Sequence, residues 1–235
     1  MPLAIESPSP NFDARPEGQA IDILLLHYTG MVSATAALAR LCDVTAKVSA
    51  HYCIDEDGTL YRLVPEAKRA WHAGAASWAG AGDINARSIG IELVNPGHEF
   101  GYRAFPDTQM ATLIELAGGI LARHPIPPGR VLGHSDVAPT RKEDPGELFD
   151  WPRLAAAGIG LWPGAAEPCD PPDAAETKRQ LAALGYGYLD DGPAAVITAF
   201  QRHFRPEKLT GEVDAETAGR LAALLGLLDP SPLNS

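Results

Sequence analysis

Short apolar runs alternate with helical patterns over the first two thirds of the chain. Residues 21–27 (IDILLLH) are almost wholly apolar and are followed by Tyr-Thr-Gly, which predicts a strand buried on both faces. Residues 88–95 (SIGIELVN) alternate in the manner of a strand, and Glu92 falls in the middle of it. Residues 130–134 (RVLGH) predict a third, brief strand.

Further patterns fill the intervals between these strands. Residues 51–64 hold two β-prone runs around an Asp-Gly pair, which predicts a hairpin. Residues 33–43 open on a serine and residues 107–124 on Asp107, and both segments have helical spacing with a capping residue in front. Strands interleaved with helices indicate an α/β fold with a central mixed β-sheet flanked by helices.

The last third of the chain has a different character. A segment rich in proline and glycine (PGAAEPCDPP) disfavours both helix and sheet and is expected to be a linker. Three amphipathic patterns follow and predict a small three-helix domain. The expected division is an α/β domain at 1–162, a linker at 163–172 and a helical domain at 173–228.

Composition and charge exclude several classes of protein. The net charge of -11, with no cluster of lysine and arginine, argues against nucleic acid as a partner. No apolar run approaches the roughly 18 to 20 residues of a membrane span. The N-terminal residues show no secretory signal, so we expect a cytoplasmic location, or a periplasmic or cell-envelope one if a leader precedes residue 1. The three cysteines form no CxxC pair, which favours free thiols. The pattern does not determine an oligomeric state.

Two of the seven histidines lie where predicted strands end. His27 and His134 are at the places where open α/β sheets present their sites. Two imidazoles and one carboxylate, with a position left open, are typical of catalytic zinc. Asp136 and Asp144 are both eligible as the carboxylate. They lie in residues 133–146, a broken segment for which we expect neither helix nor strand and in which Asp136 is expected to form a local turn.

A non-haem iron site is the alternative metal centre. His134-Ser135-Asp136 has the H-x-D spacing of a facial triad, which needs a distal histidine. The only later one, His203, falls in a predicted helix that has its own core to build, and this weakens the alternative. Lys142, two residues from Asp144, would repel a metal ion unless it serves an oxyanion.

Four separated motifs together carry a resemblance to a known family. They are LLLHYTG, WHAG, SIGIELVN and GHSDVAPTRKEDPG. In this order they resemble the zinc N-acetylmuramoyl-L-alanine amidases of the amidase type 2 family, which share a fold with peptidoglycan recognition proteins. The resemblance covers roughly residues 10–163.

The resemblance implies an activity and a set of residues. The family's zinc ligands fall on His27, His134 and Asp144, its catalytic glutamate on Glu92 and its catalytic lysine on Lys142. The implied reaction is zinc-dependent hydrolysis of the amide between N-acetylmuramic acid, including its 1,6-anhydro form, and L-alanine, in peptidoglycan or muropeptides. The alternative is a non-catalytic peptidoglycan-binding or sensing protein. Such proteins usually lack a ligand, and here the set is complete.

Substrate contacts are implied less directly. Trp71 and His72 stand in the segment that lines the family's substrate groove, with packing roles as the alternative. Arg87 and Asn95 flank the Glu92 strand and are expected to bind peptide carboxylates. The C-terminal motifs LAALGYG, AVITAFQRHF and GEVDAETAGRL resemble a peptidoglycan-binding domain of the three-helix type.

Overall fold

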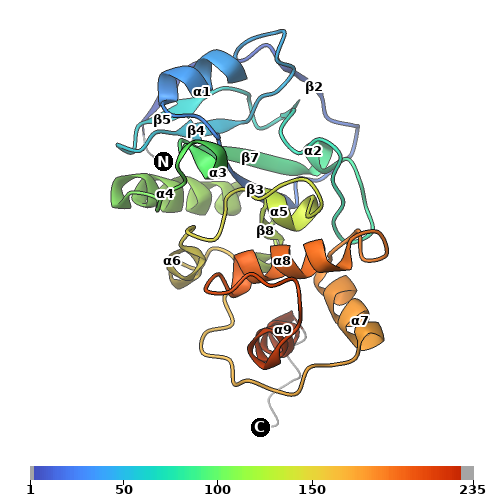
Figure 1. The fold of residues 1–235 in the computed structure, drawn as a ribbon. Coiled ribbons are helices and arrows are strands. Elements are labelled where there is room, and N and C mark those ends of the chain that lie inside the picture. Colours follow the sequence, from blue (N-terminus) through green and yellow to red (C-terminus); the bar gives the residue numbers. More distant parts are fainter. Residues whose placement is uncertain (1–2, 229–235) are drawn as a thin grey trace.

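A six-stranded mixed sheet forms the centre of the molecule (Figure 1). The computed structural model describes residues 3–228. The strand order is β1-β5-β4-β7-β3-β8, in which only the β4–β5 pair is antiparallel, as its hairpin predicts. The strands of this sheet are β1 (Ala4–Glu6), β3 (Ile23–Tyr28), β4 (Tyr52–Ile54), β5 (Leu60–Arg62), β7 (Ser88–Leu93) and β8 (Val131–Gly133), and β2 (Phe12–Ala14) pairs separately with β6 (Lys68–Ala70).

The helices up to α6 are interleaved with the strands, and α7, α8 and α9 follow after the last strand. The interleaving confirms the predicted α/β class. The helices are α1 (Ala34–Leu41), α2 (Ile84–Arg87), α3 (Gly97–Phe100), α4 (Asp107–Arg123), the 3₁₀ turn Pro128–Arg130, α5 (His134–Val137), α6 (Trp151–Ala156), α7 (Ala174–Leu184), α8 (Pro193–Phe204) and α9 (Ala215–Leu228). None of the helices described in residues 3–228 is long and apolar enough to cross a membrane.

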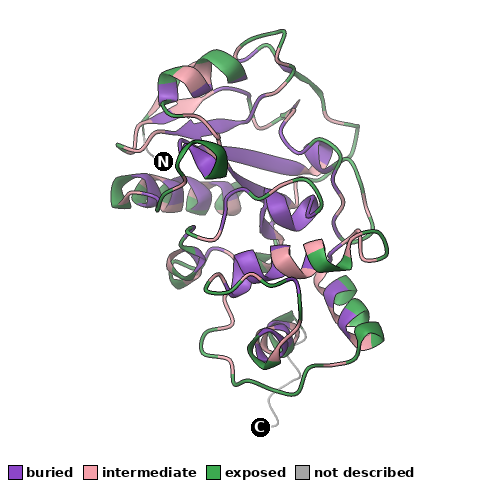
Figure 2. Ribbon diagram, in the orientation of Figure 1, coloured by how far each residue is buried: buried purple, intermediate pink, exposed green. Residues whose placement is uncertain are grey.

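Strand parity assigns each side chain of β3 to one face of the sheet. Leu24 and Leu26 pack toward α4, whose apolar side closes one core. Ile23 and Leu25 face the opposite side, where α5 and the C-terminal helices close a second core. Both faces of the central strands are therefore covered, as Figure 2 shows for β3 and β7. His27 has the parity of Ile23 and Leu25, so its side chain leaves the sheet on the α5 side.

Two local expectations were wrong. Pro106, not Asp107, is the N-cap residue of α4, and Asp107 is the first helical residue, where its carboxylate pairs with Arg153. Residues 133–146 do contain a helix, the single turn α5 that follows β8 directly. A helix of this length has too few positions to show a period in the sequence.

The C-terminal helices share a buried cluster with the α/β part of the chain. Phe200, Leu221 and Leu224 belong to the same buried cluster as Leu25 of the sheet. Helix α8 lies against α5 (Figure 1). The segment before α7 is largely exposed, but it is tied to α9, since the Cys169 amide donates to the Ala215 carbonyl at 3.0 Å. The division at 162 and 173 stays a prediction.

Candidate active site

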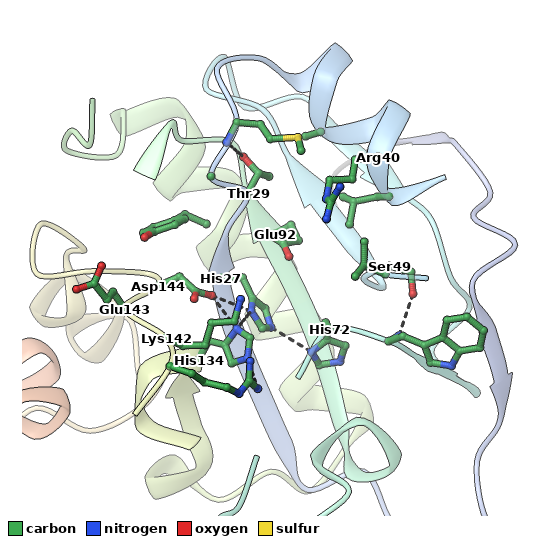
Figure 3. Close-up of a pocket in the computed structure, with 18 residues that line it drawn as sticks. His27, Thr29, Arg40, Ser49, His72, Glu92, His134, Lys142, Glu143 and Asp144 are labelled. Carbon is green, nitrogen blue, oxygen red and sulfur yellow. Dashed lines mark hydrogen bonds and ion pairs between the residues drawn. The ribbon is translucent and has the colours of Figure 1, made fainter. Parts of the chain in front are cut away.

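Three buried side chains converge at the C-terminal ends of β3 and β8. His27 is the penultimate residue of strand β3, His134 directly follows β8, and Asp144 lies in the loop after α5. His27 Nδ1, His134 Nδ1 and Asp144 Oδ2 are each 3.0 Å from the other two atoms. Figure 3 shows the three side chains meeting at one point. They are the one group of histidine, cysteine and acidic residues within 3–228 whose spacing suits a metal ion.

His27 is held by a chain of hydrogen bonds that fixes its tautomer. The Ser88 hydroxyl donates to the Ile84 carbonyl at 2.6 Å, so the Ser88 oxygen is left to accept from His72 Nε2 at 3.3 Å. His72 Nδ1 is then an acceptor, and His27 Nε2 donates to it at 3.0 Å. The proton of His27 is thereby placed on Nε2, and the lone pair on Nδ1 faces the centre of the triad.

His134 is oriented in the same sense by the backbone. Its Nε2 lies 3.0 Å from the Ala73 carbonyl, closer than the 3.4 Å to Arg141, and a carbonyl can only accept, so we assign the proton to Nε2 and the lone pair to Nδ1. The loop is closed by the Ser135 amide, which donates to the Asp144 carbonyl at 2.9 Å and brings the two ligands of this segment together. Arg141 also donates to the Ala73 and Ala75 carbonyls.

The triad is a set of three acceptors without a proton to share. Two imidazole lone pairs and a carboxylate oxygen at 3.0 Å repel one another unless a cation lies between them. Tetrahedral zinc with bonds of about 2.05 Å to nitrogen and oxygen separates its ligand atoms by roughly 3.3 Å. The observed spacing is slightly tighter than that. The residues therefore fit a divalent ion with one coordination position left open.

The protonation states agree with this donor set. Burial, together with the neighbouring His134, lowers the pKa of His27 to about 4. Burial acts to raise the pKa of Asp144, but the charges and hydrogen bonds of His134 and His27 outweigh it and hold the pKa well below the ordinary range. At neutral pH the site presents a neutral His27 and an ionised Asp144, the forms that bind a metal ion.

Glu92 is adjacent to His27 because of sheet register. The two residues are direct partners across the β3–β7 pair, and lateral partners in a parallel sheet point to the same face. Glu92 Oε2 is buried and has no hydrogen-bond partner among the described residues. Burial and the nearby Asp144 raise the pKa of Glu92 well above its usual range, while Lys142 opposes this. Because β7 lies between β4 and β3, this carboxyl group is on a central strand and not on an edge strand.

Lys142 lies beside the triad on the same loop as Asp144 (Figure 3). It is partly exposed, lines the pocket and makes no ion pair within residues 3–228. Its positive charge acts to lower the pKa of both His27 and Glu92. Lys142 thus places a cation beside the triad at the pocket.

The pocket over these residues has a volume of about 360 Å³. It runs between α1, which contributes Arg40, and the loop after α5. Trp71 and His72 line it, but His72 is buried and serves mainly as the acceptor for His27. These two predicted contact residues are therefore brought to the site.

The structure does not bring Arg87 and Asn95 to the pocket. Arg87 precedes β7, at the opposite end of the strand from Glu92, and is paired with Asp22 through bonds of 2.9 and 2.6 Å. Asn95 is fully buried, and its amide donates to the Arg103 carbonyl at 2.7 Å. Neither side chain is free to bind a peptide carboxylate in this position.

Two supporting residues, Ser88 and Gly90, were not singled out in the sequence. A Cβ atom at Gly90 would lie 2.6 Å from the ring of His72, so only glycine leaves room for that ring. A glycine within a predicted strand is the one signal that pointed to a close approach.

We expect Gly90→Ala to displace His72 and to destabilise the protein by about 1–3 kcal/mol, the usual cost of overpacking a core. Gly118→Ala is the matched control, because nothing lies within 4 Å of a Cβ there and the site is helical. That change should leave stability equal or raise it by up to about 1 kcal/mol. Urea unfolding measures both, and equal effects would contradict the packing argument.

Comparison with known proteins agrees with the geometry. The family model for N-acetylmuramoyl-L-alanine amidase matches residues 17–147. The amidase AmiD of Escherichia coli K12 is 39% identical over 250 residues, 94% of this chain and 90% of that protein. The 1,6-anhydro-N-acetylmuramyl-L-alanine amidase AmpD of Citrobacter freundii is 34% identical over 166 residues, 63% of this chain and 87% of that one.

Solved structures extend the likeness to nearly the whole chain. E. coli AmiD in complex with an anhydro-N-acetylmuramic acid tripeptide superposes with a TM-score of 0.80, covering 90% of this chain and 92% of that one at 39% identity. AmpDh3 of Pseudomonas aeruginosa gives 0.80, with 92% and 95% covered at 35% identity. With the family matched over the region that holds His27, Glu92, His134 and Asp144, the chain belongs to the N-acetylmuramoyl-L-alanine amidases of the amidase type 2 family.

Proposed function

We propose that the protein is a zinc amidase, in which the ion is held by His27, His134 and Asp144. The observation that carries this proposal is the convergence of His27 Nδ1, His134 Nδ1 and Asp144 Oδ2 at 3.0 Å from one another. Two imidazoles, one carboxylate and an open position are the donor set of catalytic zinc. When bound, zinc supplies a Lewis acid that polarises a carbonyl group and makes water a stronger nucleophile near neutral pH.

Glu92 is proposed as the group that moves the proton. It lies next to His27 on the neighbouring strand, with one oxygen that has no partner in the described chain. Its raised pKa places proton uptake closer to neutrality than for an exposed glutamate. Glu92 would accept a proton from the attacking water and deliver it to the nitrogen that leaves when the amide bond breaks.

Lys142 is proposed to stabilise the negative charge that develops on the carbonyl oxygen. We expect Lys142→Met to lower kcat about 100- to 1,000-fold, since a positioned donor of this kind is worth a few kcal/mol in the transition state. Metal content should stay at the wild-type level. Lys178→Met, which removes an exposed lysine paired with Asp190, is the control and should leave kcat unchanged. Normal turnover by Lys142→Met would remove the lysine from the mechanism.

The substrate class is proposed from the relatives. AmiD has been crystallised with an anhydro-N-acetylmuramic acid tripeptide and AmpDh3 with an anhydromuramic pentapeptide. We infer that this chain cleaves the bond between the lactyl group of an anhydromuramoyl peptide and L-alanine. Digestion of intact sacculi and of anhydromuropeptide side by side distinguishes polymer from soluble fragment, and faster cleavage of sacculi would contradict the soluble substrate.

Metal removal tests the zinc assignment. Dialysis against a chelator should abolish release of free peptide from anhydromuropeptide, and one equivalent of zinc should restore it. Mg²⁺ should not, because it prefers oxygen ligands and octahedral geometry. Full activity in the metal-free protein, or a zinc-loaded protein that binds substrate without cleaving it, would overturn the proposal.

The cytoplasmic location stays a prediction that fractionation of the host would test.

A further inference from the structure

Asp136 is a buried carboxylate that the catalytic site does not use. It is two residues from the ligand His134, has no exposed surface and does not take part in the triad. Three donors surround it: the Gly133 amide at 2.8 Å, the Tyr186 hydroxyl at 2.7 Å and His203 Nδ1 at 2.7 Å. The bond to the Gly133 amide is the local turn contact expected from the sequence, but it is not the only bond that Asp136 makes. Two of its three donors come from the C-terminal third of the chain.

His203 is placed for this one hydrogen bond. Its ring is stacked between Trp151 and Phe204, with centroids 3.6 and 3.8 Å away, and is 3% exposed. Its other nitrogen, Nε2, has no partner among residues 3–228. A buried imidazole nitrogen left unsatisfied costs free energy, and a phenyl ring would stack without that cost. The bond to Asp136 is therefore the polar function that the histidine serves here.

Asp136 connects His203 and Tyr186 to the segment that carries the metal ligand His134. Its carboxylate accepts from the amide of Gly133, the residue that caps α5 and directly precedes His134. A Cβ atom at Gly133 would come within 2.7 Å of Pro145 and 3.4 Å of Trp151, so the start of α5 is also packed closely against the other end of the loop. Asp136 therefore links the residue that precedes His134 to α8 and to Tyr186.

We propose that His203 and Tyr186 are positioning residues for the metal site, holding α5 through Asp136 so that His134 meets His27 and Asp144. This rests on the proposed zinc amidase function. The C-terminal helices would then serve catalysis directly, besides any binding to glycan. Groups that orient metal ligands typically change metal affinity about 10- to 100-fold when removed.

The test is the double variant Tyr186→Phe/His203→Phe in the full-length protein. Both changes keep an aromatic ring at each position and remove the two side-chain donors to Asp136. We expect the zinc Kd, measured by competition with a chromogenic chelator, to rise about tenfold or more. The visible spectrum of the cobalt-substituted protein should change, because it reports ligand geometry. kcat should fall while KM stays within about twofold. If His203→Asn takes the place of His203→Phe, the zinc Kd should return toward the wild-type value, because the Asn amide can place a donor where Nδ1 lies. His203→Gln in the same place should not restore the zinc Kd.

Gln201→Leu is the matched control on the same helix. Gln201 is equally buried, but its partners, Thr210, Glu212 and Thr217 among them, all lie in the C-terminal third. The Gln201→Leu variant should have a lower melting temperature than wild type, with an unchanged zinc Kd and an unchanged cobalt spectrum. If the Phe variants melt earlier but bind zinc and cobalt as wild type does, the proposal is overturned. If wild type itself binds no zinc, the zinc assignment fails instead, and the two results are distinct.

Discussion

His134→Ala should lose the metal ion and, with it, all measurable amidase activity. A zinc site of four ligands is worth roughly 10–16 kcal/mol, so one ligand accounts for about 3 kcal/mol, or about a hundredfold in affinity. Zinc content after gel filtration and peptide release from anhydromuropeptide are the measurements.

A histidine outside the pocket provides the control for this change. His124→Ala removes a bond of 2.8 Å to Glu66 and should leave both zinc content and turnover at the wild-type level. A His134→Ala protein that retains one equivalent of zinc and wild-type turnover would refute the assignment of the triad.

Glu92→Gln should separate metal binding from catalysis. The amide has nearly the same size but cannot accept the proton of water, so we expect kcat to fall about 100- to 10,000-fold, the usual range for loss of a general acid–base group. Zinc content and KM should be unchanged, because Glu92 is not a ligand. Glu6→Gln, at an exposed glutamate paired with Arg62, is the control for the chemical change alone. Wild-type kcat in Glu92→Gln would exclude the proton-transfer role.

The same variant has a predictable effect on stability in the metal-free protein. The folded state raises the pKa of Glu92 through burial, so the unfolded chain releases this proton at lower pH than the folded one. Folding is therefore progressively opposed as the pH rises above the unfolded value of about 4.3. Glu92→Gln lacks this penalty, and its advantage over wild type in urea unfolding should grow as the pH rises above about 4 and stay constant once the folded group has ionised. A difference independent of pH would indicate that Glu92 is solvated.

The sequence predicted the two histidine ligands because strands leave a recognisable apolar pattern and their ends are where such sheets carry sites. The distances along the sequence from His134 could not decide whether Asp136 or Asp144 is the carboxylate ligand. The structure explains why: each residue of a helix turns by about 100°, so two residues along α5 Asp136 points roughly opposite to His134. That single turn has no periodic signal, and the choice required either the family resemblance or coordinates.

The remaining differences between the sequence-based expectations and the structure have a common physical cause. Amphipathic patterns predicted α7, α8 and α9 correctly, but a pattern shows which face is apolar and not what covers it. The apolar face of α8 therefore looked sufficient for a separate core, whereas Phe200 packs in a cluster shared with the sheet. Arg87 was expected near Glu92 because they are close in sequence. Five residues of extended strand are about 17 Å, and this places Arg87 at the other end of β7.

The pairing of His27 with Glu92 has a consequence for how this enzyme tolerates change. Their separation is set by neighbouring backbones, at about 4.8 Å, and not by the chain between residues 29 and 87. Insertions in that intervening stretch can reshape the substrate groove while the ligand and the proton acceptor keep their spacing. A one-residue deletion inside β3 or β7 would instead turn one of them to the α4 side. Substrate preference can thus diversify in the loops, while the chemistry is inherited with the sheet.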